Sequence, residues 1–129
     1  MQVIFKTILL CLLCTINLPA NAFDGITFYG TTISNRDRVN SFGERLTSVR
    51  DILRQDRANM HKYHSHDNAD QYESFFSKPK NRNMFNTAKL KVNAKLAQQI
   101  KHGRPVNITV FVYPGEIEVI KGLPTPGIP

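Results

Sequence analysis

Two alternating runs of residues near the end of the chain constrain its fold most. In residues 106–113 a branched apolar residue stands at every second position, at Val106, Ile108, Val110 and Val112. Residues 116–119 alternate again after the pair Pro114-Gly115. Two such runs around a turn signal predict an antiparallel β-hairpin. Pro-Gly is not the pair that two-residue hairpin turns favour, which leaves room for a longer connection.

A third strand is predicted much earlier in the chain. Residues 26–33 read ITFYGTTI and are rich in β-branched and aromatic side chains, which suit a pleated, half-buried surface. Gly30 inside this run indicates a bulge or the close approach of another backbone segment.

Helical spacing of apolar residues extends over residues 42–62, at Phe42, Leu46, Val49, Leu53 and Met60. The run begins with Ser41-Phe-Gly-Glu44, which has the form of a capping box, in which two side chains satisfy free amides at a helix start. A long helix over residues 42–62 is therefore predicted.

A short helix is predicted over residues 69–76, started by Asp67 or Asn68 and ended before Pro79. A second long helix fits residues 83–102, with Phe85, Ala88, Val92, Leu96 and Ile100 on one face and Gly103 at its end. The predicted fold class is α+β: a small antiparallel sheet, made of one N-terminal strand and a C-terminal hairpin, packed by two long helices and one short helix.

The first 22 residues have the pattern of a secretory signal peptide. Lys6 precedes a short apolar run, and small residues stand at the −3 and −1 positions of a cut after Ala22. Polar residues interrupt the run before it reaches the roughly 20 residues of a membrane span. We therefore expect a bacterial protein exported to the periplasm or the cell exterior, with no stable membrane span after cleavage.

Cleavage at this site has two consequences. It removes Cys11 and Cys14, the only cysteines, so disulfides and thiolate chemistry are excluded from the mature chain. What remains is one predicted α+β domain over residues 23–121 and a flexible tail over residues 122–129, where three prolines occur. The formal net charge is +7, lowered by one with Lys6, and favours acidic partners.

The segment MHKYHSHD, residues 60–67, holds three of the four histidines. On the predicted helix the basic residues align in one stripe, made up of Arg50, Arg54, Arg57, His61 and His64. Arginine pairs with carboxylate, phosphate and sulfate, and histidine adds positive charge at acidic pH. The stripe is thus a candidate surface for an acidic protein or polyanion.

Two other interpretations of the segment stay open. His61 or His64 could serve as general base of a small secreted hydrolase of nucleic acid. Alternatively, His61, His64 and His66 could bind zinc or copper, although Arg57 and Lys62 would repel a cation. The chain lacks a phosphate-cradling glycine-rich loop, an HExxH pair and a GxSxG sequence. The predicted function is therefore non-enzymatic binding of an acidic partner, without a cofactor.

A further candidate surface lies on the predicted hairpin. Phe111 and Tyr113 alternate with the valines and should point to the opposite face of the sheet. An exposed aromatic face would be a second place for a partner to bind.

Overall fold

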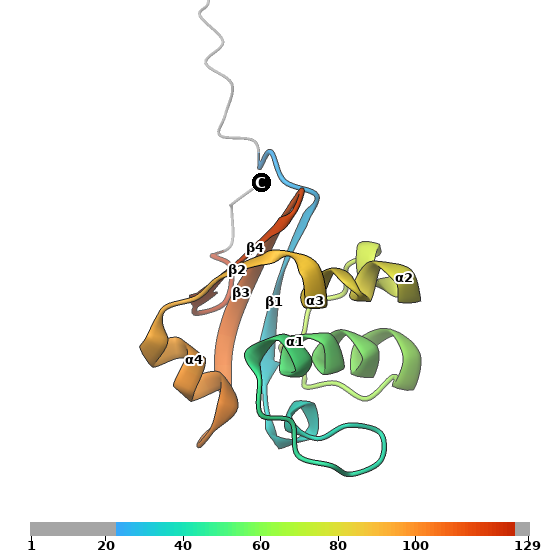
Figure 1. The fold of residues 1–129 in the computed structure, drawn as a ribbon, viewed down its shortest axis with the longest axis vertical. Coiled ribbons are helices and arrows are strands. Elements are labelled where there is room, and N and C mark those ends of the chain that lie inside the picture. Colours follow the sequence, from blue (N-terminus) through green and yellow to red (C-terminus); the bar gives the residue numbers. More distant parts are fainter. Residues whose placement is uncertain (1–22, 126–129) are drawn as a thin grey trace, which may run out of the picture.

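The structure, a computed structural model, describes residues 23–125. The predicted signal peptide, with both cysteines, and residues 126–129 of the predicted tail lie outside this part. Strands β1 (Thr27–Ile33), β3 (Val106–Tyr113), β4 (Glu116–Lys121) and β2 (Lys89–Lys91) form one sheet in the order β1-β3-β4-β2. Figure 1 shows the helices packed beside this sheet. The α+β class is confirmed.

The N-terminal strand and the hairpin are as predicted. β1 runs antiparallel to β3, with Thr27 opposite Val112, and β3 runs antiparallel to β4. Tyr113 pairs directly with Glu116, so the turn between β3 and β4 consists of the two residues Pro114 and Gly115. Gly115 has a φ of 72°, which matches the third residue of a type II turn with proline before it.

The sheet is mixed, because a strand lies where the second long helix was predicted. Residues 83–102 divide into α3 (Met84–Thr87), β2, and α4 (Ala94–Lys101), and β2 runs parallel to β4. Asn93 starts α4, since its Oδ1 accepts from the amide of Leu96 at 2.8 Å. Apolar residues three to four apart suit a helix, but here Leu90 is placed by pairing with Ile117 of β4.

The first long helix is also shorter than predicted. α1 (Val49–Ala58) begins at Ser48, whose hydroxyl accepts from the amide of Asp51, and continues as a wider π-turn through Asn59–Tyr63. The predicted capping box at Ser41 is wrong. Asn40 instead accepts from the amides of Phe42 and Glu44, which closes a turn that leaves Phe42 85% exposed.

The short helix predicted over residues 69–76 does not form. The chain there makes a turn, in which the amide of Asp70 donates to the carbonyl of Asp67 at 3.0 Å, and then runs without regular structure to a three-residue 3-10 turn, Phe75–Ser77. α2 (Pro79–Arg82) follows. Side chains of the segment bond to the sheet instead: Asp70 accepts from the amide of Thr32, and Gln71 accepts from the amide of Gly30. The free edge of β1 is thereby covered.

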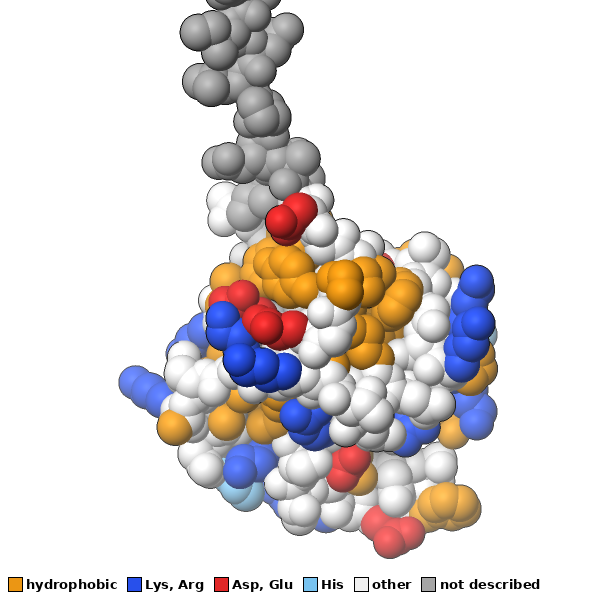
Figure 2. Space-filling model, turned by 45° about the horizontal axis from the view of Figure 1, so that its top comes forward, with side chains coloured by type: hydrophobic (Ala, Val, Ile, Leu, Met, Phe, Trp, Pro, Cys, Tyr) orange, Lys and Arg blue, Asp and Glu red, His pale blue; other side chains and the backbone are white. Residues whose placement is uncertain are grey.

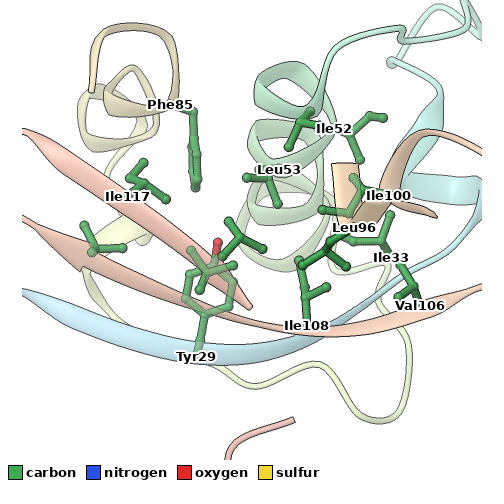
Figure 3. Close-up of a cluster of buried hydrophobic side chains, with 14 of the residues drawn as sticks. Tyr29, Ile33, Ile52, Leu53, Phe85, Leu96, Ile100, Val106, Ile108 and Ile117 are labelled. Carbon is green, nitrogen blue, oxygen red and sulfur yellow. The ribbon is translucent and has the colours of Figure 1, made fainter. Parts of the chain in front are cut away.

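The hydrophobic core lies between the sheet and the helices, as Figure 3 shows for its central side chains. Strand residues such as Tyr29, Ile108 and Ile117 meet Leu53 of α1 and Ile100 of α4, and all are almost fully buried. The predicted apolar face of the hairpin is therefore the face toward the core.

The opposite face of the sheet carries an aromatic cluster. Phe23 packs edge-on against Phe28 at 5.2 Å between ring centroids, and it also contacts Phe111 and Tyr113. The chain after β4 returns over this face, so that Pro124 lies against Gly30. No helix within residues 23–125 is long and apolar enough to cross a membrane.

Candidate functional site

Arg57, the middle of the predicted basic stripe, lies in the interior of the protein. Its side chain is fully buried, and its guanidinium lies 3.8 Å from the centre of the Tyr29 ring. Nε donates to Asp56 at 2.8 Å, and Nη1 donates to Glu73 at 3.2 Å and to the carbonyl of Gln71 at 2.9 Å. Burial removes this residue from any surface that a partner could contact.

More carboxylates surround this ion pair. The Thr31 hydroxyl lies 2.7 Å from Asp56 and 2.9 Å from Asp70, so its single proton serves two acids. Burial raises the pKa of Asp56, while Arg57 and Thr31 act in the opposite direction. Burial, together with the charge of Asp56, raises the pKa of Asp37 to about 7.

We call these groups the buried charge network, made up of Thr31, Asp37, Asp56, Arg57, Asp67, Asp70 and Glu73. It joins β1, α1 and the segment of residues 67–73. The network contains five of the ten acidic residues of the chain, of which Asp67 and Asp70 are half-buried. Since only one arginine lies among them, the acids are held mainly by hydrogen bonds from backbone and side chains.

His61 contacts this network from the outside. Its Nε2 lies 2.6 Å from Oε1 of Glu73, its side chain is 3% exposed, and the ring of Tyr72 packs edge-on against it at 5.1 Å. A cavity of about 360 Å³ beside it is also lined by His64 and His66. A carboxylate bonded to one ring nitrogen fixes the imidazole, as in catalytic and metal-binding histidines.

The other two histidines of the cavity are exposed. His64 adopts a left-handed backbone conformation, with a φ of 52°, and ends the π-turn. Nδ1 of His66 lies 3.1 Å from the carbonyl of Asp67. Among residues 23–125 there is no cluster of three or more His, Cys, Asp or Glu side chains placed to hold a metal ion.

The remaining members of the predicted stripe separate from the histidines. Arg50 donates through Nη1 to the carbonyls of Phe85 and Ala88 and thus holds α3 against α1. Arg54 is exposed and donates to Oδ1 of Asn83 at 2.9 Å. Of the five predicted docking residues, Arg54 and His64 are therefore the two that are exposed.

Arg54 lines a cleft that brings together three cations from different elements. We call it the cationic cleft. It has a volume of about 280 Å³ and is lined by Arg54 of α1, Lys62 of the π-turn and Arg82 of α2, together with Asp51 and Tyr63. Hydrogen bonds from Ser41 and Lys62 lower the pKa of Tyr63, and the charges of Lys62 and Arg82 act in the same direction.

Sequence reasoning missed two of these cations. Lys62 follows Arg54 by eight residues, close to two further helical turns, so helical periodicity could have placed both on one face. Arg82 arrives from a separate element through tertiary packing. Neither is paired with a carboxylate within 4.0 Å in the part of the chain that the structure describes.

Arg38 is a second buried arginine, and its role is structural. Its guanidinium donates to the carbonyls of Gln99, Ile100 and Gly103 at the end of α4, at 3.0, 2.9 and 2.7 Å. These carbonyls have no partners within the helix, so the arginine satisfies them and complements the negative end of the helix dipole.

Among residues 23–125, the exposed charged side chains are mainly basic. Three acidic residues are exposed, namely Asp24, Glu44 and Asp51. Eleven lysines and arginines of residues 23–125 are exposed, namely Arg36, Arg45, Arg54, Lys62, Lys78, Lys80, Lys89, Lys91, Lys95, Arg104 and Lys121. On the face drawn in Figure 2, Lys and Arg side chains form several separate groups, acidic side chains occur in a few places, and a hydrophobic patch lies in the upper part.

No protein-family model matches this chain, and no curated protein or solved structure matches it either.

Proposed function

We propose that this is an exported, non-enzymatic binding protein that docks an acidic partner through cations on α1, on the π-turn that continues it and at the start of α2. The contact surface comprises Arg54, Lys62, Lys78 and Lys80, of which Arg54 belongs to the stripe predicted from the sequence. The observation that carries the proposal is the excess of exposed cations, since among residues 23–125 eleven lysines and arginines are exposed but only three acidic residues are. Such a surface attracts acidic partners over distances of about a Debye length.

Within this proposal, the buried members of the stripe support the surface without contacting the partner. Arg57 and His61 both contact Glu73, the last residue of the segment 67–73 that covers the edge of β1. They thereby fix the segment against α1. α1, which carries Arg54, is therefore held on its inner side by these contacts. A docking residue on a helix fixed in this way loses less entropy on binding.

The test uses the chain from Phe23 to Pro129 and heparin as a polyanion probe, with poly-L-glutamate as a carboxylate probe. We expect the affinity for both probes to fall steeply as the salt concentration rises from about 50 to about 300 mM, because salt screens exposed charges. Affinity that does not change with salt would contradict docking by charge.

A matched pair of variants locates the surface. Arg54→Gln/Lys80→Gln removes two charges beside α1 and α2, while Lys95→Gln/Lys121→Gln removes two from α4 and β4. We expect the first variant to bind heparin about tenfold more weakly and the second about threefold or less, since rim charges contribute modestly. Equal losses would show that binding depends on net charge alone.

A second candidate function is hydrolysis of nucleic acid with His61 as general base. The observation that favours it is the 2.6 Å contact of His61 with Glu73 beside a cavity that His64 and His66 also line. A carboxylate that orients an imidazole leaves its other nitrogen able to take a proton. The check is RNA cleavage by the wild type and by His61→Gln, with His102→Gln as control. No cleavage by the wild type would remove this candidate.

A further inference from the structure

The cationic cleft has features of a site for one charged group. Arg54 and Lys62 reach it from α1 and the π-turn that continues α1, and Arg82 reaches it from α2, which meets them only in the folded protein. Its volume of about 280 Å³ lies just below the range of pockets for whole drug-sized ligands. The cleft thus fits a single substituent of a larger partner better than a complete small molecule.

Arg82 distinguishes this cleft from a surface patch of basic residues. It is only 7% exposed, and its Nη1 donates to the carbonyl of Phe76 at 2.8 Å. Phe76 is the one hydrogen-bond partner of its guanidinium among the described residues, although a guanidinium has five N–H donors. A buried charge without a counter-ion is costly, so an anion in the cleft would stabilise it.

Contacts with neighbouring side chains hold the other two cations of the cleft. Oδ1 of Asn83 accepts from Nη2 of Arg54, and the ammonium of Lys62 lies 5.1 Å from the centre of the Tyr63 ring. Holding the side chains before binding reduces the rotamer entropy that the ligand must offset. Two planar guanidinium groups offer the paired donors that phosphate oxygens accept.

The charge of the cleft indicates the charge of the group. Three cations face one carboxylate, Asp51, which leaves an excess of two positive charges. A carboxylate, a sulfate ester or a phosphodiester carries one negative charge, whereas a phosphate monoester approaches two at pH 7. We propose that the cationic cleft binds a phosphate monoester group carried by the acidic partner. This inference rests on the proposed function and specifies the chemistry of its central contact.

The experiment compares phenyl phosphate with phenyl sulfate, which share the apolar ring and differ in charge at pH 7.5. Binding to the chain from Phe23 to Pro129 is measured by calorimetry at constant ionic strength. We expect phenyl phosphate to bind about tenfold more tightly, and its advantage to shrink at pH 5, where the phosphate becomes a monoanion. Equal affinities for the two esters at pH 7.5 would overturn the inference.

Variants assign the binding to the cleft. Arg54→Gln and Lys62→Gln are exposed changes that should preserve the fold, and each should weaken phenyl phosphate binding about fivefold or more. Arg82→Lys keeps the charge but loses the fork of donors and should weaken binding similarly. The control Lys95→Gln should bind as the wild type does, and a loss in the control equal to that in Arg54→Gln would overturn the assignment.

The heparin measurements separate this inference from the proposed function. If heparin binds with the expected salt dependence while phenyl phosphate does not bind, the phosphate site is wrong and acidic docking stands. If neither probe binds, both proposals are wrong.

Discussion

The guanidinium of Arg57 lies 3.8 Å from the centre of the Tyr29 ring, in the fully buried middle of the domain. The stacked pair joins α1 to β1, and Arg57 also bonds to Glu73 from the segment that covers the sheet edge. A buried ion pair need not stabilise a protein relative to apolar residues, but removing one partner leaves the other charge without compensation. Arg57 is therefore the residue on which three parts of the fold depend.

Replacing Arg57 by methionine should lower the free energy of unfolding by about 3–5 kcal/mol, because Asp56 and Glu73 lose their shared cation. Urea unfolding followed by circular dichroism measures the change. Arg54→Met on the same helix is the control and should cost about 1 kcal/mol or less, since Arg54 is exposed. A loss below about 1 kcal/mol for Arg57→Met would contradict a central role of this network.

Asp37→Asn should change how stability depends on pH. Burial raises the pKa of Asp37 to about 7 in the folded protein, above its ordinary value of 3.8. An acid whose pKa rises on folding stabilises the fold below its unfolded pKa, and this contribution is lost as the pH rises through the folded pKa. The stability of the wild type relative to Asp37→Asn should therefore fall between pH 4 and pH 8, by at most about 4 kcal/mol.

Urea unfolding of both proteins at pH 4, 6 and 8 provides the measurement. The free energy of unfolding of the wild type relative to that of Asp37→Asn should be highest at pH 4 and lowest at pH 8. A difference that is constant over this range would mean that Asp37 titrates in the folded protein as it does in the unfolded chain.

His64→Gly should stabilise the protein. His64 ends the π-turn with a φ of 52°, a region that glycine adopts more readily than other residues. Relief of this strain exceeds the entropy that glycine adds to the unfolded chain, so we expect a gain of about 0.5–1 kcal/mol. The control is His66→Gly, whose φ is not positive and which should lower stability. A loss of stability in both variants would show that the His64 side chain has a structural role.

Gly30→Ala should displace the chain that follows β4. A Cβ atom at this position would lie 2.4 Å from Cδ of Pro124 and 3.2 Å from Cδ2 of Leu123. We expect a loss of about 1–3 kcal/mol in the chain from Phe23 to Pro129, as for overpacking elsewhere. In a chain that ends at Gly122 the same substitution should cost much less. Equal costs in the two backgrounds would place the steric conflict elsewhere.

Local patterns in the sequence determined the first strand, the C-terminal hairpin and the class of the fold. The alternation in residues 106–119 and the β-branched run at residues 26–33 correspond to β3, β4 and β1. Helical period also predicted α1, although its start lies at Ser48 rather than Ser41. Such features depend on neighbours in the chain, and period and turn chemistry record them directly.

Tertiary structure alone decided the rest. Residues 89–91 form a strand because β4 offers them an edge, although their spacing also suits a helix. Arg57 lies on the predicted basic face of α1, yet the interior accepts it because Glu73 and Tyr29 supply a counter-charge and a ring from other elements. Arg54 and Arg82 line one cleft because tertiary packing places α2 beside α1. Helical period places a side chain on a face, but only packing decides whether that face meets water, an ion or another helix.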